Sequence, residues 1–131
     1  RAFEAALERI GPCTVVTHSS GGGYGYRLAF EHPESVRTVV SLEPSTFPEE
    51  VPESLEGQRF LQVMGDYLDR CALWAGMDRR TREWSDQLIR VGAQSAHVVL
   101  ADEGLAGHSH MFMMDRSHDA ILHRLLDGSL G

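Results

Sequence analysis

Hydroxyl, carboxyl and imidazole side chains follow one another along this chain at points where apolar runs end. The segment "TVVTHSSGGGYGYRLAFEHPESV", residues 14–36, passes from an apolar run into His-Ser-Ser and three glycines. Glu43 follows a second apolar run, and His108 and His110 lie in a loop after the last one. A serine paired with a histidine that a carboxylate orients is a nucleophile for acyl transfer. The pattern indicates either such a nucleophile or a flexible polar loop between two elements.

Alternating strands and helices are expected to position these side chains. β-Branched and apolar runs bounded by turn residues predict strands at 13–18, 36–44, 59–67 and 96–102. Apolar residues at helical spacing predict helices at 2–10, 20–32, 78–93 and 117–130. Strands joined through helices pair in parallel with right-handed crossovers. We therefore expect an α/β fold with a mostly parallel sheet of about four strands, flanked by helices.

Ligands of parallel sheets bind beyond the carboxyl ends of the strands, so the residues after each strand form the candidate site. These are His18, Ser19, Ser20, Glu43, Asp66, Asp69, His108 and His110. They occur in the chain order serine, acid, histidine. One edge of the sheet is thus expected to hold the parts of a catalytic triad.

The serine segment fits a nucleophile elbow, a sharp turn that presents the serine at the end of a strand. The usual Gly-x-Ser-x-Gly pattern appears as Thr17-His18-Ser19-Ser20-Gly21, with threonine in place of the first glycine. The helix that follows directs unpaired N–H groups towards the site, and the Ser20 N–H is the predicted oxyanion donor. His18 is expected to pack under the elbow or line the pocket without moving a proton.

Three stretches together resemble the C-terminal half of an α/β-hydrolase, and most closely a subgroup of bacterial and fungal esterases. They are "THSSGG", "VVSLEP" and "GHSHMFMMDRSHDAILHRLL". The resemblance implies that residues 1–131 form a partial hydrolase domain, from the elbow strand to the C-terminal helix. It implies a Ser19, Glu43, His110 triad, because these esterases carry a glutamate after the neighbouring strand and a Gly-x-x-His-Met stretch. It also implies hydrolysis of small carboxylic esters without a cofactor.

Two alternatives concern individual residues of the triad. Asp69, with Asp66 close by, occupies the more common hydrolase position for the acid, one strand further along. Neighbouring strands lie about 4.8 Å apart, so either loop can reach the histidine. The proline after Glu43 fixes the backbone beside the carboxylate and favours Glu43. The Gly-x-x-His-Met pattern likewise selects His110 over His108.

Apolar residues near this edge suggest a hydrophobic acyl or alcohol pocket, with core packing as the competing interpretation. The candidates are Phe47, Trp74, Met111 and Phe112.

Composition narrows the classes of partner. The chain has 131 residues, a formal charge of −7 and 12 basic residues, all arginine, which argues against nucleic acid as the partner. No apolar run approaches the roughly 20 residues that span a bilayer. Cys13 and Cys71 either pair or remain free. Because the chain does not start with methionine, we expect it to begin inside a longer polypeptide.

Two rival functions remain open. His108, His110 and a carboxylate could bind a metal, although no third ligand has a convincing spacing. The chain could also be an inactive, hydrolase-like binding module. A complete hydrolase supplies further strands and a second oxyanion donor, so the elbow strand is expected to pair with the remaining half of the fold or with another chain.

Overall fold

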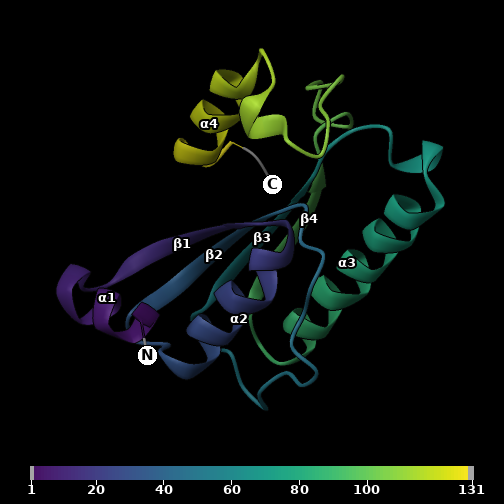
Figure 1. Ribbon diagram of the computed structural model, residues 1–131. Helices are drawn as coiled ribbons and strands as arrows, with labels where there is room; N and C mark the ends of the chain where they lie inside the picture. Colours follow the sequence, from purple (N-terminus) through teal and green to yellow (C-terminus); the bar gives the residue numbers. More distant parts are fainter. Residues whose placement is uncertain (1, 130–131) are drawn as a thin grey trace.

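The computed structural model describes residues 2–129 (Figure 1). Its elements, in chain order, are α1 (Ala2–Ile10), β1 (Cys13–His18), η1 (Ser19–Gly21), α2 (Gly22–Glu31), β2 (Val36–Leu42), β3 (Arg59–Met64), η2 (Leu68–Arg70), α3 (Ala72–Arg90), β4 (Gln94–Val99), η3 (Phe112–Met114) and α4 (His118–Leu126), where η denotes a 3-10 helix.

The four strands form one parallel sheet in the order β1-β2-β3-β4, so the spatial order follows the chain order. Val15 pairs with Val39, and Val39 with Phe60, which places the carboxyl ends of the strands at a common edge. The predicted α/β fold with about four parallel strands is confirmed.

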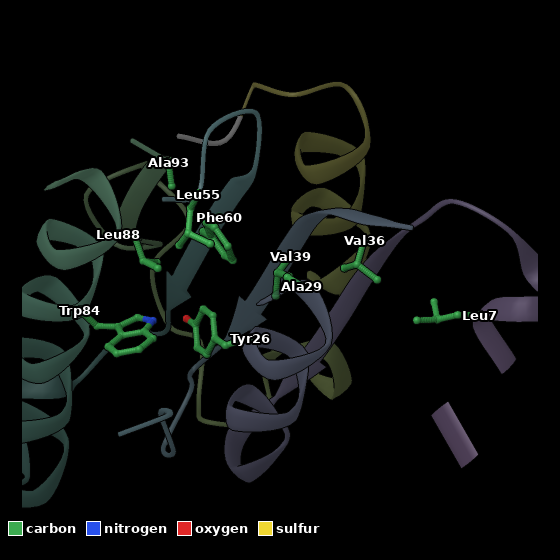
Figure 2. Packing of buried hydrophobic residues seen from close by; sticks show 10 residues of the cluster. All are labelled: Leu7, Tyr26, Ala29, Val36, Val39, Leu55, Phe60, Trp84, Leu88 and Ala93. Carbon is green, nitrogen blue, oxygen red and sulfur yellow. The ribbon is translucent and has the colours of Figure 1, made fainter. Parts of the chain in front are cut away.

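Successive side chains of a strand point to opposite faces of the sheet, and the apolar ones form one layer on each face. Val39 faces the layer formed with α1, α2 and α3, whereas its neighbour Val40 faces the layer formed with α4. In the first layer Tyr26 of α2 packs edge-on against Trp84 of α3, with ring centroids 5.3 Å apart (Figure 2). The second layer centres on Leu42, Val63, Phe112 and Ile121. Helices therefore cover both faces of the sheet, with α4 on the side away from α1 and α2 (Figure 1).

Several boundaries differ from those expected. β2 ends at Leu42 because Glu43 adopts a left-handed backbone with φ of 42°. The helix expected from residue 20 begins with the 3-10 turn η1 and becomes α-helical at Gly22. α3 begins at Ala72, six residues before the expected start, because the apolar residues before Asp78 continue the helix. α4 ends at Leu126, shortly before Gly128, which has a φ of 73°.

Candidate active site

The turn after β1 places Ser19 at the edge of the sheet. The backbone of His18 is still extended, whereas Ser19 has a φ of 53°. Residues other than glycine rarely adopt this left-handed conformation. The Ser45 N–H donates to the Ser19 carbonyl oxygen at 3.0 Å. Gly22 allows the start of α2 to approach the segment after β2, because an added Cβ would lie 2.8 Å from Pro44 Cβ. The backbone thus holds Ser19 in a sharp strand-to-helix turn.

Ser19, His110 and Glu43 form a continuous series of hydrogen bonds. His110 Nε2 lies 3.2 Å from Ser19 Oγ, and His110 Nδ1 lies 2.5 Å from Glu43 Oε2. An ionised carboxylate can only accept, so His110 carries its proton on Nδ1 and presents the Nε2 lone pair to the serine hydroxyl. Glu43 is 2% exposed, and its other oxygen accepts from the Gly65 N–H at 2.7 Å. The structure thus brings together the three residues of the predicted triad.

Two aromatic rings flank the His110 imidazole. The His18 ring lies 4.5 Å from it and the Trp74 ring 4.4 Å, measured between centroids. His18 Nε2 also lies 2.9 Å from the His110 carbonyl oxygen, so this nitrogen carries a proton and donates. The rings and this hydrogen bond restrict rotation of His110. Of the four predicted pocket residues, Trp74 lies directly at the site.

The other candidates lie elsewhere. Asp69 is exposed in η2 and makes no hydrogen bond with the described residues. His108 is buried beside Ser117, with Nε2 3.3 Å from Ser117 Oγ, rather than beside Ser19. Phe47 and Phe112 belong to the two apolar layers, and Met111 is 42% exposed. Cys13 and Cys71 are both free thiols.

The turn after β3 contacts both Glu43 and the loop that carries His110, whereas the sequence placed Asp66 only close to the alternative acid, Asp69. Gly65 donates to Glu43, and the Asp66 N–H donates to the His108 carbonyl oxygen at 2.9 Å. The Asp66 carboxylate accepts from the N–H groups of Gly107, at 2.8 Å, and Tyr67, at 2.6 Å. These backbone hydrogen bonds hold the pKa of Asp66 below its ordinary value. The Gly-Asp pair directly after an apolar run was the pattern that could have indicated it.

Within residues 2–129, no group of three His, Cys, Asp or Glu side chains is arranged to hold a metal ion. None of the helices in that range is both long and apolar enough to cross a membrane.

Two curated lipases are similar to this chain over part of its length. A probable secreted lipase, phiG, of a fungal species is 46% identical over 48 residues, which cover 37% of this chain and 13% of the lipase. Lipase LipV of Mycobacterium tuberculosis is 33% identical over 82 residues, or 58% of this chain and 28% of LipV. No protein-family model matches the chain.

Two solved structures share the fold. A novel bacterial esterase matches 95% of this chain with a TM-score of 0.84 and 24% identity. A carboxylesterase from Mesorhizobium loti matches 97% with a TM-score of 0.68 and 23% identity. The chain corresponds to 40% of the first protein and 57% of the second. Its four-stranded parallel sheet and helices thus have the fold of part of an esterase of the α/β-hydrolase type.

Proposed function

We propose that this chain, which has an α/β-hydrolase-like fold of the esterase and lipase type, is the part of a serine esterase that carries the catalytic triad. The observation that carries the proposal is the series of hydrogen bonds from Ser19 through His110 to the buried Glu43. The similar proteins are named lipases and esterases, which supports ester hydrolysis as the reaction. The substrate is a small carboxylic ester.

In the proposed mechanism Ser19 Oγ attacks the ester carbonyl carbon while its proton moves to His110 Nε2. Glu43 accepts the Nδ1 hydrogen bond, keeps the imidazole in the required tautomer and stabilises its positive form. The tetrahedral intermediate expels the alcohol, which takes the proton from Nε2, and leaves an acyl-enzyme on Ser19. Water then attacks the acyl group, giving a proton to His110, and the acid leaves as Ser19 regains its proton.

The proposed oxyanion donor is the Ser20 N–H. Ser20 lies at the start of the helical segment that runs from η1 into α2, where the first N–H groups lack carbonyl partners within the helix. The positive end of the helix dipole favours negative charge at the same place. A single preorganised donor of this kind is worth roughly 3 kcal/mol of transition-state stabilisation.

The nucleophile is tested by challenging the protein and its Ser19→Ala variant with a fluorophosphonate probe and a p-nitrophenyl ester. We expect the wild type to be labelled and to release p-nitrophenol, and Ser19→Ala to lose both properties, because no hydroxyl remains to attack. A Ser20→Ala variant keeps the backbone N–H and serves as the matched control. Labelling that persists in Ser19→Ala would refute the proposal.

The acid is tested with Glu43→Gln and Asp69→Asn in the same assay. Loss of the carboxylate at Glu43 removes the charge that stabilises the imidazolium, so we expect a fall in kcat of about 10⁴-fold, as when other triads lose their acid. Asp69→Asn should leave kcat unchanged. The reverse result would transfer the role of the acid to Asp69.

An inactive binding module remains the second candidate. It is favoured by the free edge of β1, at which the described residues place no neighbouring strand. Binding of a p-nitrophenyl ester without turnover, in a wild type that the fluorophosphonate does not label, would establish this alternative.

A further inference from the structure

The turn after β3, Gly65 and Asp66, lies between the acid and the base of the site. The strand order β2-β3-β4 places the end of β3 between Glu43, which follows β2, and the loop after β4 that carries His110. An added Cβ on Gly65 would lie 2.5 Å from Glu43 Oε1 and 3.1 Å from the Ser109 carbonyl oxygen. Only a residue without a side chain fits there, so the acid and the loop pack directly against this turn.

Asp66 binds the histidine loop at two consecutive residues. Its N–H donates to the His108 carbonyl oxygen at 2.9 Å, and its Oδ2 accepts from the Gly107 N–H at 2.8 Å. Gly107 is 41 residues away along the chain, so these contacts attach the loop to the sheet. The other carboxylate oxygen accepts from the Tyr67 N–H, which holds the Asp66 side chain in place.

A second aspartate, Asp115, binds the next loop residue, Ser109. Asp115 accepts from the Ser109 N–H at 2.7 Å and from the Ser109 hydroxyl at 3.2 Å. Residues 107, 108 and 109 are therefore each held by a hydrogen bond, and His110 follows directly. The loop hydrogen bonds lower the pKa of both aspartates, so both are ionised acceptors at neutral pH.

We propose that Asp66 is a positioning residue for His110, which it aligns through its hydrogen bonds to Gly107 and His108. This rests on the proposed esterase function of the same site. Asp66 is not the acid of the triad, because its two oxygens accept from backbone N–H groups while His110 Nδ1 binds Glu43. Without the carboxylate, the loop loses its hydrogen bond at Gly107 and keeps only the backbone hydrogen bond at His108, so His110 is held less firmly at its distance to Ser19.

The kinetic test compares Asp66→Ala and Asp66→Asn with the wild type in p-nitrophenyl acetate hydrolysis. We expect kcat of Asp66→Ala to fall about 10- to 100-fold, because small misplacements of catalytic groups cause losses of this size. KM should stay within about twofold of the wild-type value. Asp66→Asn should recover part of the loss, because its amide oxygen can still accept from Gly107. The matched control is Asp102→Ala, an exposed aspartate in the turn after β4 whose side chain has no partner among the described residues.

The second readout is the proton NMR resonance of His110 Nδ1–H, which is expected far downfield because its hydrogen bond to a carboxylate is short. At a temperature where both variants are folded, this resonance should disappear or broaden in Asp66→Ala and persist in Asp102→Ala. Unchanged kcat and an unchanged resonance in a folded Asp66→Ala would overturn the positioning role. If the wild type shows the resonance but hydrolyses no ester, and Asp66→Ala loses the resonance, the esterase proposal fails while the positioning role stands.

Discussion

Left-handed backbone at residues other than glycine marks the ends of three neighbouring strands. Ser19, Glu43 and Tyr67 have φ of 53°, 42° and 61°, and each lies within three residues of the end of β1, β2 or β3. Such conformations cost of order 1–3 kcal/mol each and persist where the surrounding structure enforces them. Here they turn the chain sharply away from the sheet, so Ser19 and Glu43 project at its edge.

Gly65→Ala tests how closely the acid packs against the turn after β3. The new methyl group would overlap Glu43 Oε1, which must move away from the Gly65 N–H and disturb the hydrogen bond to His110. We expect kcat for a p-nitrophenyl ester to fall at least about tenfold. Gly76→Ala is the control, because an added Cβ there meets only the tip of Arg79 at 3.9 Å. Equal activity of the two variants would contradict this account.

The sequence predicted the contacts of only some of the side chains at this site. Ser19 and Glu43 directly follow strands and His110 lies in the loop after the last strand, which indicated that they share an edge, and the structure places them in contact. The role of Asp66 was not predictable in the same way. Its partners are the backbone N–H of Gly107 and the carbonyl oxygen of His108, and no side-chain pattern reveals which backbone groups a loop presents.

At the scale of elements, the contact between β1 and α2 depends on a larger residue in the strand, Thr17, facing a glycine in the helix, Gly25. Thr17 stands where the usual elbow pattern has glycine, and α2 passes close to it at Gly25. A Cβ on Gly25 would lie 2.6 Å from Thr17 Cγ2 and 3.3 Å from Val39 Cγ1. The glycine absent from the strand is thus compensated by one in the helix, which keeps the elbow and its helix close together.

Gly25→Ala is therefore expected to destabilise the fold by about 1–3 kcal/mol, as other overpacking substitutions do. Thr17→Ala in the same chain removes the clashing atoms, so the double variant should recover most of the loss. Gly76→Ala, in an open part of α3, should instead stabilise by up to about 1 kcal/mol through helix propensity. Urea unfolding of the single variants Thr17→Ala, Gly25→Ala and Gly76→Ala and of the double variant measures these differences, and additive effects of Thr17→Ala and Gly25→Ala would refute the compensation.

A buried histidine, His97, at the contact between β4 and α3 should make the stability of the fold depend on pH. His97 of β4 has a side chain that is 6% exposed, and its Nε2 lies 2.9 Å from Asp78 Oδ1 of α3. Burial, followed by the charge of Arg82, lowers the pKa of His97 from its ordinary 6.5, although Asp78 opposes the shift. The unfolded chain therefore binds a proton at this histidine at a higher pH than the folded chain does, and stability falls as pH drops below about 6.5.

Unfolding in urea at about pH 7.5 and 5.5 checks this expectation. The wild type should lose more stability on acidification than His97→Gln, which cannot titrate at that position. His123→Gln, an exposed position on α4, is the control and should keep the wild-type dependence. An identical loss in the wild type and His97→Gln would exclude His97 as its source.

The positions of most elements followed from the sequence, whereas several ends did not. β-Branched runs and helical spacing predicted four strands and four main helices. Strand ends depend on where the backbone leaves the ladder, and Glu43 leaves β2 through a left-handed conformation that its residue type does not favour. The early start of α3 was missed because "ALWAGM" lies beside a polar loop and lacks a cap residue such as serine or aspartate before it.

For the whole molecule, the most notable surface is the exposed apolar face of the sheet beside the edge strand β1. Thr14 and Val16 face a groove of about 290 Å³ between β1, β2 and α4, lined also by Val40, Leu122 and Leu126. Val16 is 59% exposed. An unpaired edge strand next to an apolar face favours association with another strand. The prediction therefore stands that the rest of a hydrolase sheet, or another chain, covers this surface.

Residues 1–131 expressed alone should associate with one another as concentration rises, and Val16→Lys should reduce this association by placing a charge in the groove. Ile89→Lys is the matched control, since Ile89 of α3 is similarly exposed, at 51%, but lies outside the groove. Light scattering coupled to size-exclusion chromatography gives the mass of each variant. A concentration-independent monomer for the wild type would contradict the prediction.

The order of the strands has a consequence for when the site can form. The proposed nucleophile and acid, Ser19 and Glu43, follow β1 and β2, which are adjacent in both chain and sheet, whereas the proposed base, His110, lies 67 residues beyond Glu43. During synthesis, Ser19 and Glu43 leave the ribosome well before His110 does. If the proposed function holds, a nascent or partly folded chain has a serine that no imidazole activates, and hydrolysis becomes possible only when β4 and its loop dock. Ester cleavage by this site would thus report that the last strand of the sheet is in place.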